Sequence, residues 1–503
     1  MSVHVTSPTL EEVRAIAQKG SYRRVPVKRE IYADAFTTVE VLRALREESN
    51  HVFLLESAEA DQRWGRYSFL GFDPSMEITC LDGLLRVRTN VGTGKSQIEE
   101  RQVEHPGAFL RQVIEENRAP RLEGFPPFAG GLVGYFAYDY LKYAEPCLRH
   151  DGLGHEDFLD VDLMLFDELV VFDTYRQMVV LIANVVVDGE KDLDEAYAYA
   201  EEKLDRIEKI IRTGERRQFE PLKLTGELTP RFSREEFSGM VEKAKRHIYD
   251  GDIFQVVLSN PITAPAEGNL FDAYRVLRTT NPSPYMFYFT SDDVEIAGAS
   301  PETLARLDDG QLFTYPLAGT RPRGATPEQD LALEHELLAD EKELAEHNML
   351  VDLGRNDLGR VAELGSVHVD SYLQVLRFSH VMHIGSTVSA QIAADKDAVD
   401  AIDSILPAGT LSGAPKLRAC QIIQELEGSK RGIYGGAIGY LDFTGNLDTC
   451  IGIRLAYKKN DEVCVQSGAG IVFDSVPERE YQECLNKAGA VLDALHKAEG
   501  GLA

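Results

Sequence analysis

Residues 163–187, LMLFDELVVFDTYRQMVVLIANVVV, constrain the fold of this chain more than any other segment. β-branched and aromatic residues fill the run, and this composition is typical of strands. Comparable runs lie at 52–55, 130–140, 254–260, 284–290, 435–443, 449–457 and 462–473. The helical segments among the later runs do not alternate with them regularly enough for a doubly wound parallel sheet. We therefore expect an α+β fold with large, mainly antiparallel sheets covered by helices.

The chain divides into three predicted segments. Residues 1–212 form a β-rich N-terminal domain that ends in a charged helix over 192–213. The segment 213–230 is polar and contains two glycines and two prolines, so it is predicted to be a linker. Residues 231–495 mix helices and strands and are predicted to form the second domain. Capping boxes at Thr9/Glu12 and Ser233/Glu236 predict two helix starts.

Charge and composition limit the partners of this protein. A net charge of -29 argues against nucleic acid, because phosphate contacts need a basic face. An anionic substrate would need a local metal ion or a few well-placed cationic side chains. The sequence has no uncharged stretch of membrane-spanning length and no apolar signal region at its start, so we expect no membrane partner. None of the 6 cysteines forms a CxxC pair, and a reducing cytoplasm is the simplest location.

Two Glu-x-x-Glu pairs suggest a cation site. Glu343 and Glu346 form one pair, and Glu480 and Glu483 form the other. Residues three apart are neighbours on a helix surface, so each pair shares a face. Either pair alone is also typical of a solvated helix. If the fold brings the two faces together, the four carboxylates need a cation, and such hard oxygen ligands suit Mg²⁺.

Three further side chains are candidates for chemistry. His383 follows an apolar run and is either a buried base or a core histidine with its hydrogen bonds satisfied. Arg454 lies in a strand-like run, where a buried arginine needs an anionic partner. Glu302 follows a proline near the start of an element and could equally be a helix cap. Glycine-rich clusters at 316–324, 406–416, 432–440 and 466–475 allow close approach of an anion but are also common in turns.

At this point the motifs resemble those of the chorismate-utilising enzyme family. The resemblance rests on ADEKELAEHNMLVDLGRNDLGRV (339–361), PLAGTRPRG (316–324), SHVMHI (379–384), LPAGTLSGAPK (406–416), GIYGGAIGY (432–440), SGAGIV (467–472) and PEREYQECLNKA (477–488). LLES (54–57), GRYSFLGFDP (65–74) and NPSPYMF (281–287) are similar to the large subunits of anthranilate synthases, one branch of that family. The resemblance implies chorismate as substrate and Mg²⁺ as cofactor.

The resemblance assigns roles residue by residue. It implies Glu346 and Glu483 as direct Mg²⁺ ligands, with Glu343 and Glu480 holding metal-bound water. Glu302 matches the general acid for loss of the ring C4 hydroxyl, and we expect neighbouring acids to raise its pKa. His383 matches the base that removes the C2 proton. The matching substrate-binding positions are Gly319, Thr320, Thr410, Tyr434, Arg454, Gly468, Ala469, Gly470 and Lys487.

Two positions separate the branches of the family. Gln255 stands where isochorismate and salicylate synthases have a lysine that activates water, and Gln is no general base. Ala318 stands where many aminodeoxychorismate synthases have a nucleophilic lysine. Both differences favour direct attack of ammonia at C2. The alternative is an aminodeoxychorismate synthase component that aminates at C4 without the lysine.

The resemblance also implies a partner and an inhibitor. No cysteine lies in a Gly-x-Cys-x-Gly-like context, so ammonia would come from a separate glutamine amidotransferase subunit in a hetero-oligomer. Positions of a tryptophan feedback site match Glu56, Ser57, Pro284, Tyr285 and Met286. A carboxylate can bind the ammonium group of tryptophan, and apolar residues can flank its indole. The alternative is that LLES simply ends a strand.

Overall fold

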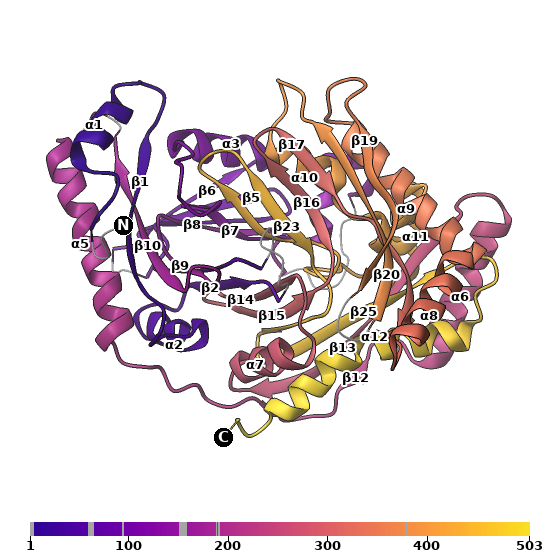
Figure 1. Cartoon of the computed structure of the whole chain (residues 1–503). Coiled ribbons are helices and arrows are strands. Elements are labelled where there is room, and N and C mark those ends of the chain that lie inside the picture. The colour runs from indigo at the N-terminus through magenta and orange to yellow at the C-terminus, as the bar shows by residue number, and fades with distance from the viewer. Residues whose placement is uncertain are drawn as a thin grey trace.

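The protein is built from two large sheets packed face to face, with helices on their outer surfaces (Figure 1). The computed structural model describes residues 5–58, 65–92, 95–149, 158–187, 189, 192–377 and 381–502. Every pair of named strands in this part of the chain is antiparallel. The predicted α+β class with mainly antiparallel sheets is confirmed.

The first sheet begins with N-terminal strands and ends with C-terminal ones. Its order is β1 (Arg24–Tyr32), β10 (Met178–Val186), β9 (Glu168–Asp173), β3 (Tyr67–Phe72), β2 (Val52–Glu56), β14 (Tyr285–Thr290), β15 (Val294–Ser300), β24 (Leu455–Lys459), β25 (Glu462–Ile471), β13 (Gln255–Glu267) and β11 (Lys223–Leu224). Two short strands, β12 (Thr229–Pro230) and β21 (Gly413–Ala414), also pair with β13.

The second sheet mixes the two halves in the same way. Its order is β18 (Leu317–Pro322), β20 (Val381–Gln391), β17 (Gln311–Thr314), β16 (Thr303–Asp308), β23 (Leu447–Ile451), β22 (Ala437–Asp442), β7 (Gly131–Phe136), β8 (Val161–Phe166), β4 (Met76–Leu81), β5 (Leu84–Thr89) and β6 (Gln97–Gln102). The strand β19 (His368–Arg377) pairs with β20.

Helices bury the outer faces of both sheets. The first sheet is covered by α1 (Leu10–Ala17), α2 (Thr38–Glu48), α5 (Leu193–Thr213), α7 (Phe271–Thr280) and α12 (Pro477–Ala498). The second is covered by α3 (Gly107–Glu116), α9 (Glu341–Gly359) and α10 (Ala398–Ile405). Against β13 and β25 pack α6 (Arg234–Tyr249) and α11 (Lys416–Glu427), and α8 (Pro327–Ala339) packs on β20.

An aromatic core joins the inner faces of the sheets. Phe53 of β2 meets Phe166 of β8 edge-to-face, with ring centroids 4.8 Å apart. Such pairs contribute beyond the area they bury. The same core includes Phe287 of β14 and Ile438 of β22, so its residues come from both halves of the chain.

Both halves of the sequence are hydrogen-bonded into the same sheets. Glu56 of β2 lies opposite Met286 of β14, and Phe136 of β7 lies opposite Ala437 of β22. Part of the predicted linker 213–230 forms β11 and β12 at the edge of β13. The division into 1–212 and 231–495 stays a prediction, and its boundary does not separate the two sheets.

The chain crosses between the two sheets at two neighbouring places. The chain passes from β15 to β16 at Pro301–Glu302 and returns from β23 to β24 at Gly452–Arg454. The crossings are tied together, because Ile451 N donates to Glu302 O (3.0 Å) and Ala299 N donates to Arg454 O (3.0 Å). The expectation that Arg454 lies within a strand is wrong. Its φ of 53° places it in the left-handed region at the corner between sheets.

Both predicted capping boxes are present, at the starts of α1 and α6. Among the described helices, none is both long and apolar enough to cross a lipid bilayer.

Candidate active site

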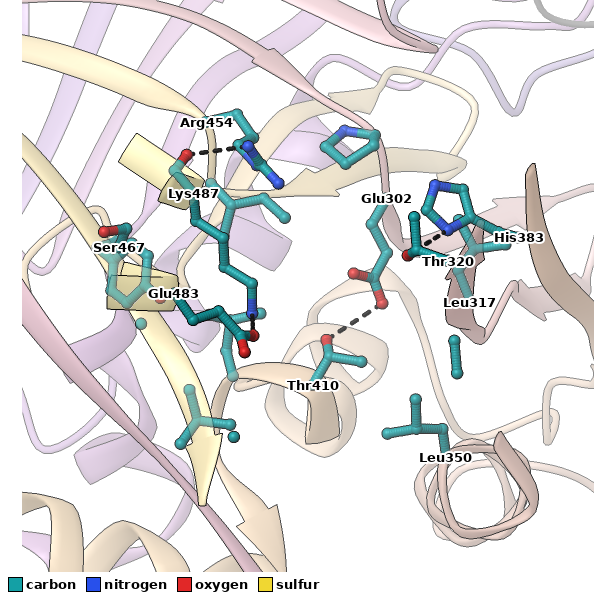
Figure 2. A pocket seen from close by; sticks show the side chains of 18 of the residues that line it. Glu302, Leu317, Thr320, Leu350, His383, Thr410, Arg454, Ser467, Glu483 and Lys487 are labelled. Atoms are coloured by element: carbon teal, nitrogen blue, oxygen red, sulfur yellow. Dashed lines mark hydrogen bonds and ion pairs between the residues drawn. The ribbon is translucent and has the colours of Figure 1, made fainter. Parts of the chain in front are cut away.

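A cavity of about 410 Å³ opens beside the two crossings (Figure 2). Its walls come from the crossings, from β18, β20 and β25, and from the helices α9 and α12. Most of the predicted active-site residues line it. They are Glu302, Gly319, Thr320, Glu343, Glu346, His383, Thr410, Tyr434, Arg454, Gly468, Gly470, Glu483 and Lys487. Two predicted residues, Ala469 and Glu480, are not among the lining residues.

Glu302 is a half-buried residue whose carboxyl has few polar contacts. Thr410 Oγ1 donates to its Oε1 at 3.1 Å (Figure 2). Burial raises the pKa of Glu302 to about 7, while the Thr410 hydrogen bond and the charge of Lys487 act in the opposite direction. The expected direction of the pKa shift is therefore found, but the expected cause is wrong, because no neighbouring acid contributes to it. A carboxyl with this pKa can donate a proton near neutral pH.

His383 lies in β20 opposite Thr320 of β18. Its Nδ1 is 2.9 Å from the carbonyl oxygen of Gly319 and 3.1 Å from Thr320 Oγ1. A carbonyl only accepts, so Nδ1 of the neutral ring donates to it and Nε2 carries the lone pair. Burial lowers the pKa of His383, so the ring is neutral at pH 7 and can act as a base.

Gly319 allows this arrangement. It forms a bulge in β18 with φ 65°, in the left-handed region that favours glycine. An added Cβ would lie 2.9 Å from Leu337 Cδ1 and 3.3 Å from Glu343 Oε2. The bulge turns the Gly319 carbonyl toward His383.

Arg454 supplies a half-buried positive charge to the cavity. Its Nη1 donates to the carbonyl oxygen of Lys487 at 2.9 Å. Among the described residues it forms no ion pair with a carboxylate, and burial lowers its pKa. A desolvated guanidinium without a protein carboxylate suits an anionic ligand. The buried Tyr434 also lines this wall.

One backbone edge of β25 lacks a strand partner beside Arg454. The strand β24 pairs with β25 only as far as Val465, while β13 stays paired to Ile471. Alternate backbone groups beyond Val465 therefore have no β24 partner and lie along the cavity. A Cβ on Gly468 would come within 2.8 Å of the Tyr434 hydroxyl, so this close packing requires glycine.

The two Glu-x-x-Glu pairs lie on α9 and α12 and act on one another electrostatically. Burial raises the pKa of Glu346, and the charges of Glu343 and Glu483 raise it further. Lys487 Nζ forms an ion pair with Glu483 Oε1 at 2.8 Å. No three acidic, histidine or cysteine side chains of the described chain stand close enough together to hold a metal ion as they are. The oxygen donors suit Mg²⁺ in kind, but the predicted convergence of four carboxylates is not present in this arrangement.

Gln255 and Ala318, the two positions that separate the branches, both line the cavity. Gln255 Oε1 is buried and has no hydrogen-bond partner within the described chain. The cavity has no lysine at either position, so neither a base that activates water nor an amine nucleophile is available there.

A second cavity, of about 90 Å³, gathers all five residues of the predicted tryptophan site. Glu56, Ser57, Pro284, Tyr285 and Met286 meet there because β2 pairs with β14.

The carboxylate of Glu56 is bound elsewhere. It accepts hydrogen bonds from Thr38, Tyr274 and Arg278, the last at 2.8 and 3.1 Å. The binding of the tryptophan ammonium group by this carboxylate stays a prediction, and in this arrangement the carboxylate already accepts hydrogen bonds from these three side chains.

A short polar chain leads from the second cavity toward Glu302. Tyr285 donates its phenolic proton to Asp448 Oδ1 at 2.8 Å and accepts from Thr303 Oγ1 at 3.1 Å. Thr303 is the residue after Glu302. Burial raises the pKa of Asp448 to about 6, and Arg306 opposes this.

Sequence reasoning missed several polar residues at both cavities. Asp448 and Arg306 line the second cavity. A buried ion pair, Glu427–Arg431, stands behind the first. The i,i+4 spacing of the two residues could have indicated an ion pair. The burial of the pair could not be predicted in this way, because it depends on the tertiary structure.

Comparison with known proteins agrees with this geometry. The sequence model of a family described as chorismate binding enzyme matches residues 51–493. The chain is 45% identical over 501 residues to anthranilate synthase component 1 of Acetivibrio thermocellus, covering 98% of this chain and 99% of that protein. It is 41% identical over 496 residues to the protein of the same name from Aquifex aeolicus, covering 98% of each.

Two solved structures share the fold. Anthranilate synthase component I from Streptococcus pneumoniae superposes with a TM-score of 0.73 at 38% identity, covering 86% of this chain and 93% of that one. The menaquinone-specific isochorismate synthase of Escherichia coli superposes with a TM-score of 0.68 at 22% identity, covering 97% of this chain and 98% of that one. At this lower identity the likeness concerns the fold alone.

Proposed function

Because the chain belongs to the family of chorismate-binding enzymes, we propose that it converts chorismate and ammonia to anthranilate, pyruvate and water. Its near-full-length relatives at 41–45% identity carry the name anthranilate synthase component 1, which supports this choice within the family. In this role the protein would carry out the first step of tryptophan biosynthesis.

One observation carries the proposal. A carboxyl with a raised pKa, a neutral imidazole and a guanidinium without a carboxylate partner line the same cavity, in Glu302, His383 and Arg454. These are an acid, a base and an anion-binding group. Chorismate is a dianion whose conversion needs a proton donor at one step and a proton acceptor at another.

The proposed steps balance with these residues. Ammonia attacks ring C2, the ring double bonds shift, and Glu302 protonates the C4 hydroxyl, which leaves as water. His383 then removes the C2 proton, and that C–H electron pair makes the ring aromatic as the C3–O ether bond breaks. The side chain leaves as the enolate of pyruvate, which takes up a proton at its methylene carbon to give pyruvate. Arg454 and Tyr434 hold the enolpyruvyl carboxylate, with the backbone of Gly468–Gly470 beside it. The absence of lysine at 255 and 318 supports attack by ammonia at C2.

We assign Mg²⁺ to Glu343, Glu346, Glu480 and Glu483. Their oxygen donors suit the ion, and three of them line the cavity. When bound, the ion supplies positive charge for the ring carboxylate of the substrate.

Ammonia would come from a glutamine amidotransferase partner in a hetero-oligomer. The relatives' designation as component 1 supports a second component. All six cysteines of the chain are free and five are buried, which agrees with a reducing cytoplasm. Tryptophan would inhibit through the second cavity, because its five matching residues meet there.

The test is an assay with chorismate, an ammonium salt and Mg²⁺. Anthranilate is followed by its fluorescence, and the product is identified by chromatography. We expect the ortho-amino product. A para-amino product would instead assign the alternative aminodeoxychorismate activity, and absence of any aromatic amine would refute the proposed function.

A further inference from the structure

A buried ion pair stands directly behind the wall of the active-site cavity. Glu427 is the last residue of α11, and Arg431 lies in the loop that follows. Arg431 Nε donates to Glu427 Oε2 at 2.9 Å and Arg431 Nη2 to Oε1 at 2.5 Å. Only 2% of Arg431 and 3% of Glu427 are exposed. Burial alone disfavours the guanidinium charge, but Glu427 outweighs it, and the pKa of Arg431 is raised.

The guanidinium also holds two backbone segments of the cavity wall. Arg431 Nη1 donates to Leu411 O and Nη2 to Val257 O, each at 2.7 Å. Both Leu411 and Val257 line the cavity. Leu411 directly follows Thr410, whose hydroxyl donates to Glu302. The guanidinium therefore helps to hold the short turn that brings Thr410 to the catalytic acid.

The carboxylate extends the same network to a third wall. Glu427 Oε1 accepts from Ser259 N at 2.8 Å and from Ser259 Oγ at 2.9 Å. Ser259 Oγ in turn accepts from Gln466 Nε2 at 2.8 Å, and Gln466 lines the cavity on β25.

Aromatic rings flank the guanidinium. Its Cζ lies 4.8 Å from the ring centroid of Tyr138 and 5.7 Å from that of Tyr434. Tyr434 is one of the residues assigned to the substrate carboxylate.

This arrangement is costly if it serves stability alone. Removing two charges from water carries a large desolvation penalty, and well-packed apolar residues often give equal stability. A planar guanidinium offers donors in fixed directions, which an apolar side chain cannot do. The geometry is therefore better explained by placement of the groups around it.

We propose that the Glu427–Arg431 pair is a positioning device that sets Thr410 against Glu302 and thereby tunes proton donation by the catalytic acid. The inference rests on the proposed function, in which Glu302 is that acid. Arg431 and Glu427 act through Thr410 and do not touch the substrate.

The physical consequence has a definite sign. The Thr410 hydrogen bond lowers the pKa of Glu302. If the turn at Leu411 loosens, this bond weakens and the pKa of Glu302 rises. The charge of Lys487 on α12 lowers the pKa of Glu302. The other charged or titratable side chains that line the cavity are Arg454, His383, Glu343, Glu346 and Glu483. All of these stay unchanged in the variants below.

The experiment is a double-variant cycle read from pH profiles of kcat. Arg431→Lys keeps the charge but loses the fixed donor directions. We expect its kcat to fall roughly 10- to 100-fold with little change in KM, and its alkaline limb to move upward by about half a pH unit. Thr410→Val should move the limb in the same direction. The double variant should move it no further than Thr410→Val alone, because both act on one hydrogen bond.

A matched control separates positioning from stability. Arg176 forms a two-pronged ion pair with Glu30, at 2.9 and 2.8 Å, in the N-terminal part of the chain. Arg176→Lys should lower the melting temperature and leave the pH profile in place. If Arg431→Lys does not fold, Ser259→Ala, which removes one hydroxyl from the network, should give a smaller shift of the same sign.

Several outcomes overturn the inference. One is a folded Arg431→Lys, or failing that Ser259→Ala, with a lower melting temperature and the wild-type profile. Another is a shift that simply adds to that of Thr410→Val. A crystal structure of the variant gives an answer independent of turnover, since an intact Thr410–Glu302 hydrogen bond would also overturn it. Failure of the wild-type protein to make anthranilate refutes the proposed function instead.

Discussion

Glu302 and His383 owe their ionisation states to burial. Burial raises the pKa of the carboxyl to about 7 and lowers that of the imidazole. At neutral pH the Glu302 carboxyl therefore still carries a proton in about half of the molecules, and the His383 ring is neutral with an unprotonated Nε2. The proposed acid and base thus differ in their environment in the way that their roles need.

Replacing Glu302 tests the acid. We expect Glu302→Gln to lower kcat about 10²- to 10⁴-fold, the range for loss of a general acid, with little change in KM for chorismate. Because the protonated form donates, wild-type kcat should fall as pH rises through about 7. Anthranilate fluorescence from pH 6 to pH 9 measures both effects. Wild-type activity that keeps rising over this interval would contradict the assignment.

Replacing His383 tests the base. His383→Ala keeps the acid, so amination should proceed while the C2 proton stays in place. We expect aminodeoxyisochorismate to accumulate and pyruvate release to cease. Mass spectrometry detects the intermediate, and coupling to lactate dehydrogenase detects pyruvate. Normal anthranilate production by this variant would rule out the role.

The residues of the proposed Mg²⁺ site lie on the helices α9 and α12. A chelator should abolish anthranilate formation, and Mg²⁺ should restore it. If Mg²⁺ binds the folded protein and not the unfolded chain, it should also raise the melting temperature. Glu346→Gln should remove this rise, whereas Glu341→Gln, an exposed position on the same helix, should retain it. Equal melting curves with and without Mg²⁺ for the wild-type protein would contradict the site.

The residues of the proposed tryptophan site meet where strands β2 and β14 pair. Ser57→Phe adds a ring to a cavity of about 90 Å³, which leaves no room for an indole. We expect tryptophan to lose most of its inhibition. The rate without tryptophan should stay within about twofold, because Ser57 does not line the active-site cavity. Inhibition curves for both proteins measure this. Unchanged inhibition would place the regulatory site elsewhere.

Local sequence patterns predicted the starts of two helices, but they did not predict where the chain passes from one sheet to the other. The capping boxes at Thr9 and Ser233 are confirmed, because the residues that form each box are three apart. The run containing Arg454 was expected to be one strand, yet it breaks into β23 and β24 of different sheets. Nothing in its composition marks that change of sheet.

The site residues that lie in long motifs were predicted from the sequence, but the contacts between residues far apart in the sequence were not. Glu302, His383 and Arg454 were identified from the resemblance, and they do line one cavity. The engagement of Glu56 by Arg278 and Tyr274, and the hold of Arg431 on Leu411, depend on residues far apart in sequence. Such contacts arise only from the tertiary arrangement.

The whole molecule has a proposed amination site. None of its cysteines lies in the Gly-x-Cys-x-Gly-like context that releases ammonia from glutamine. We expect the purified chain to make anthranilate from chorismate with an ammonium salt and not with glutamine alone. Adding an amidotransferase component should restore use of glutamine. Glutamine-dependent turnover by the verified pure chain would contradict this division of labour.

The interleaved sheets also govern how the protein can fold during its synthesis. β2 ends at Glu56 but pairs with β14, which begins at Tyr285, and β7 ends at Phe136 but pairs with β22, which begins at Ala437. A nascent chain leaving the ribosome can pair β2 with β3 and β7 with β8, but the other edge of β2 and of β7 stays open until the late strands emerge. Unpaired edges favour aggregation. Production of the intact protein should accordingly depend on chaperones that hold the first half in solution, and a premature stop codon before residue 437 would leave the N-terminal strand β7 with one open edge.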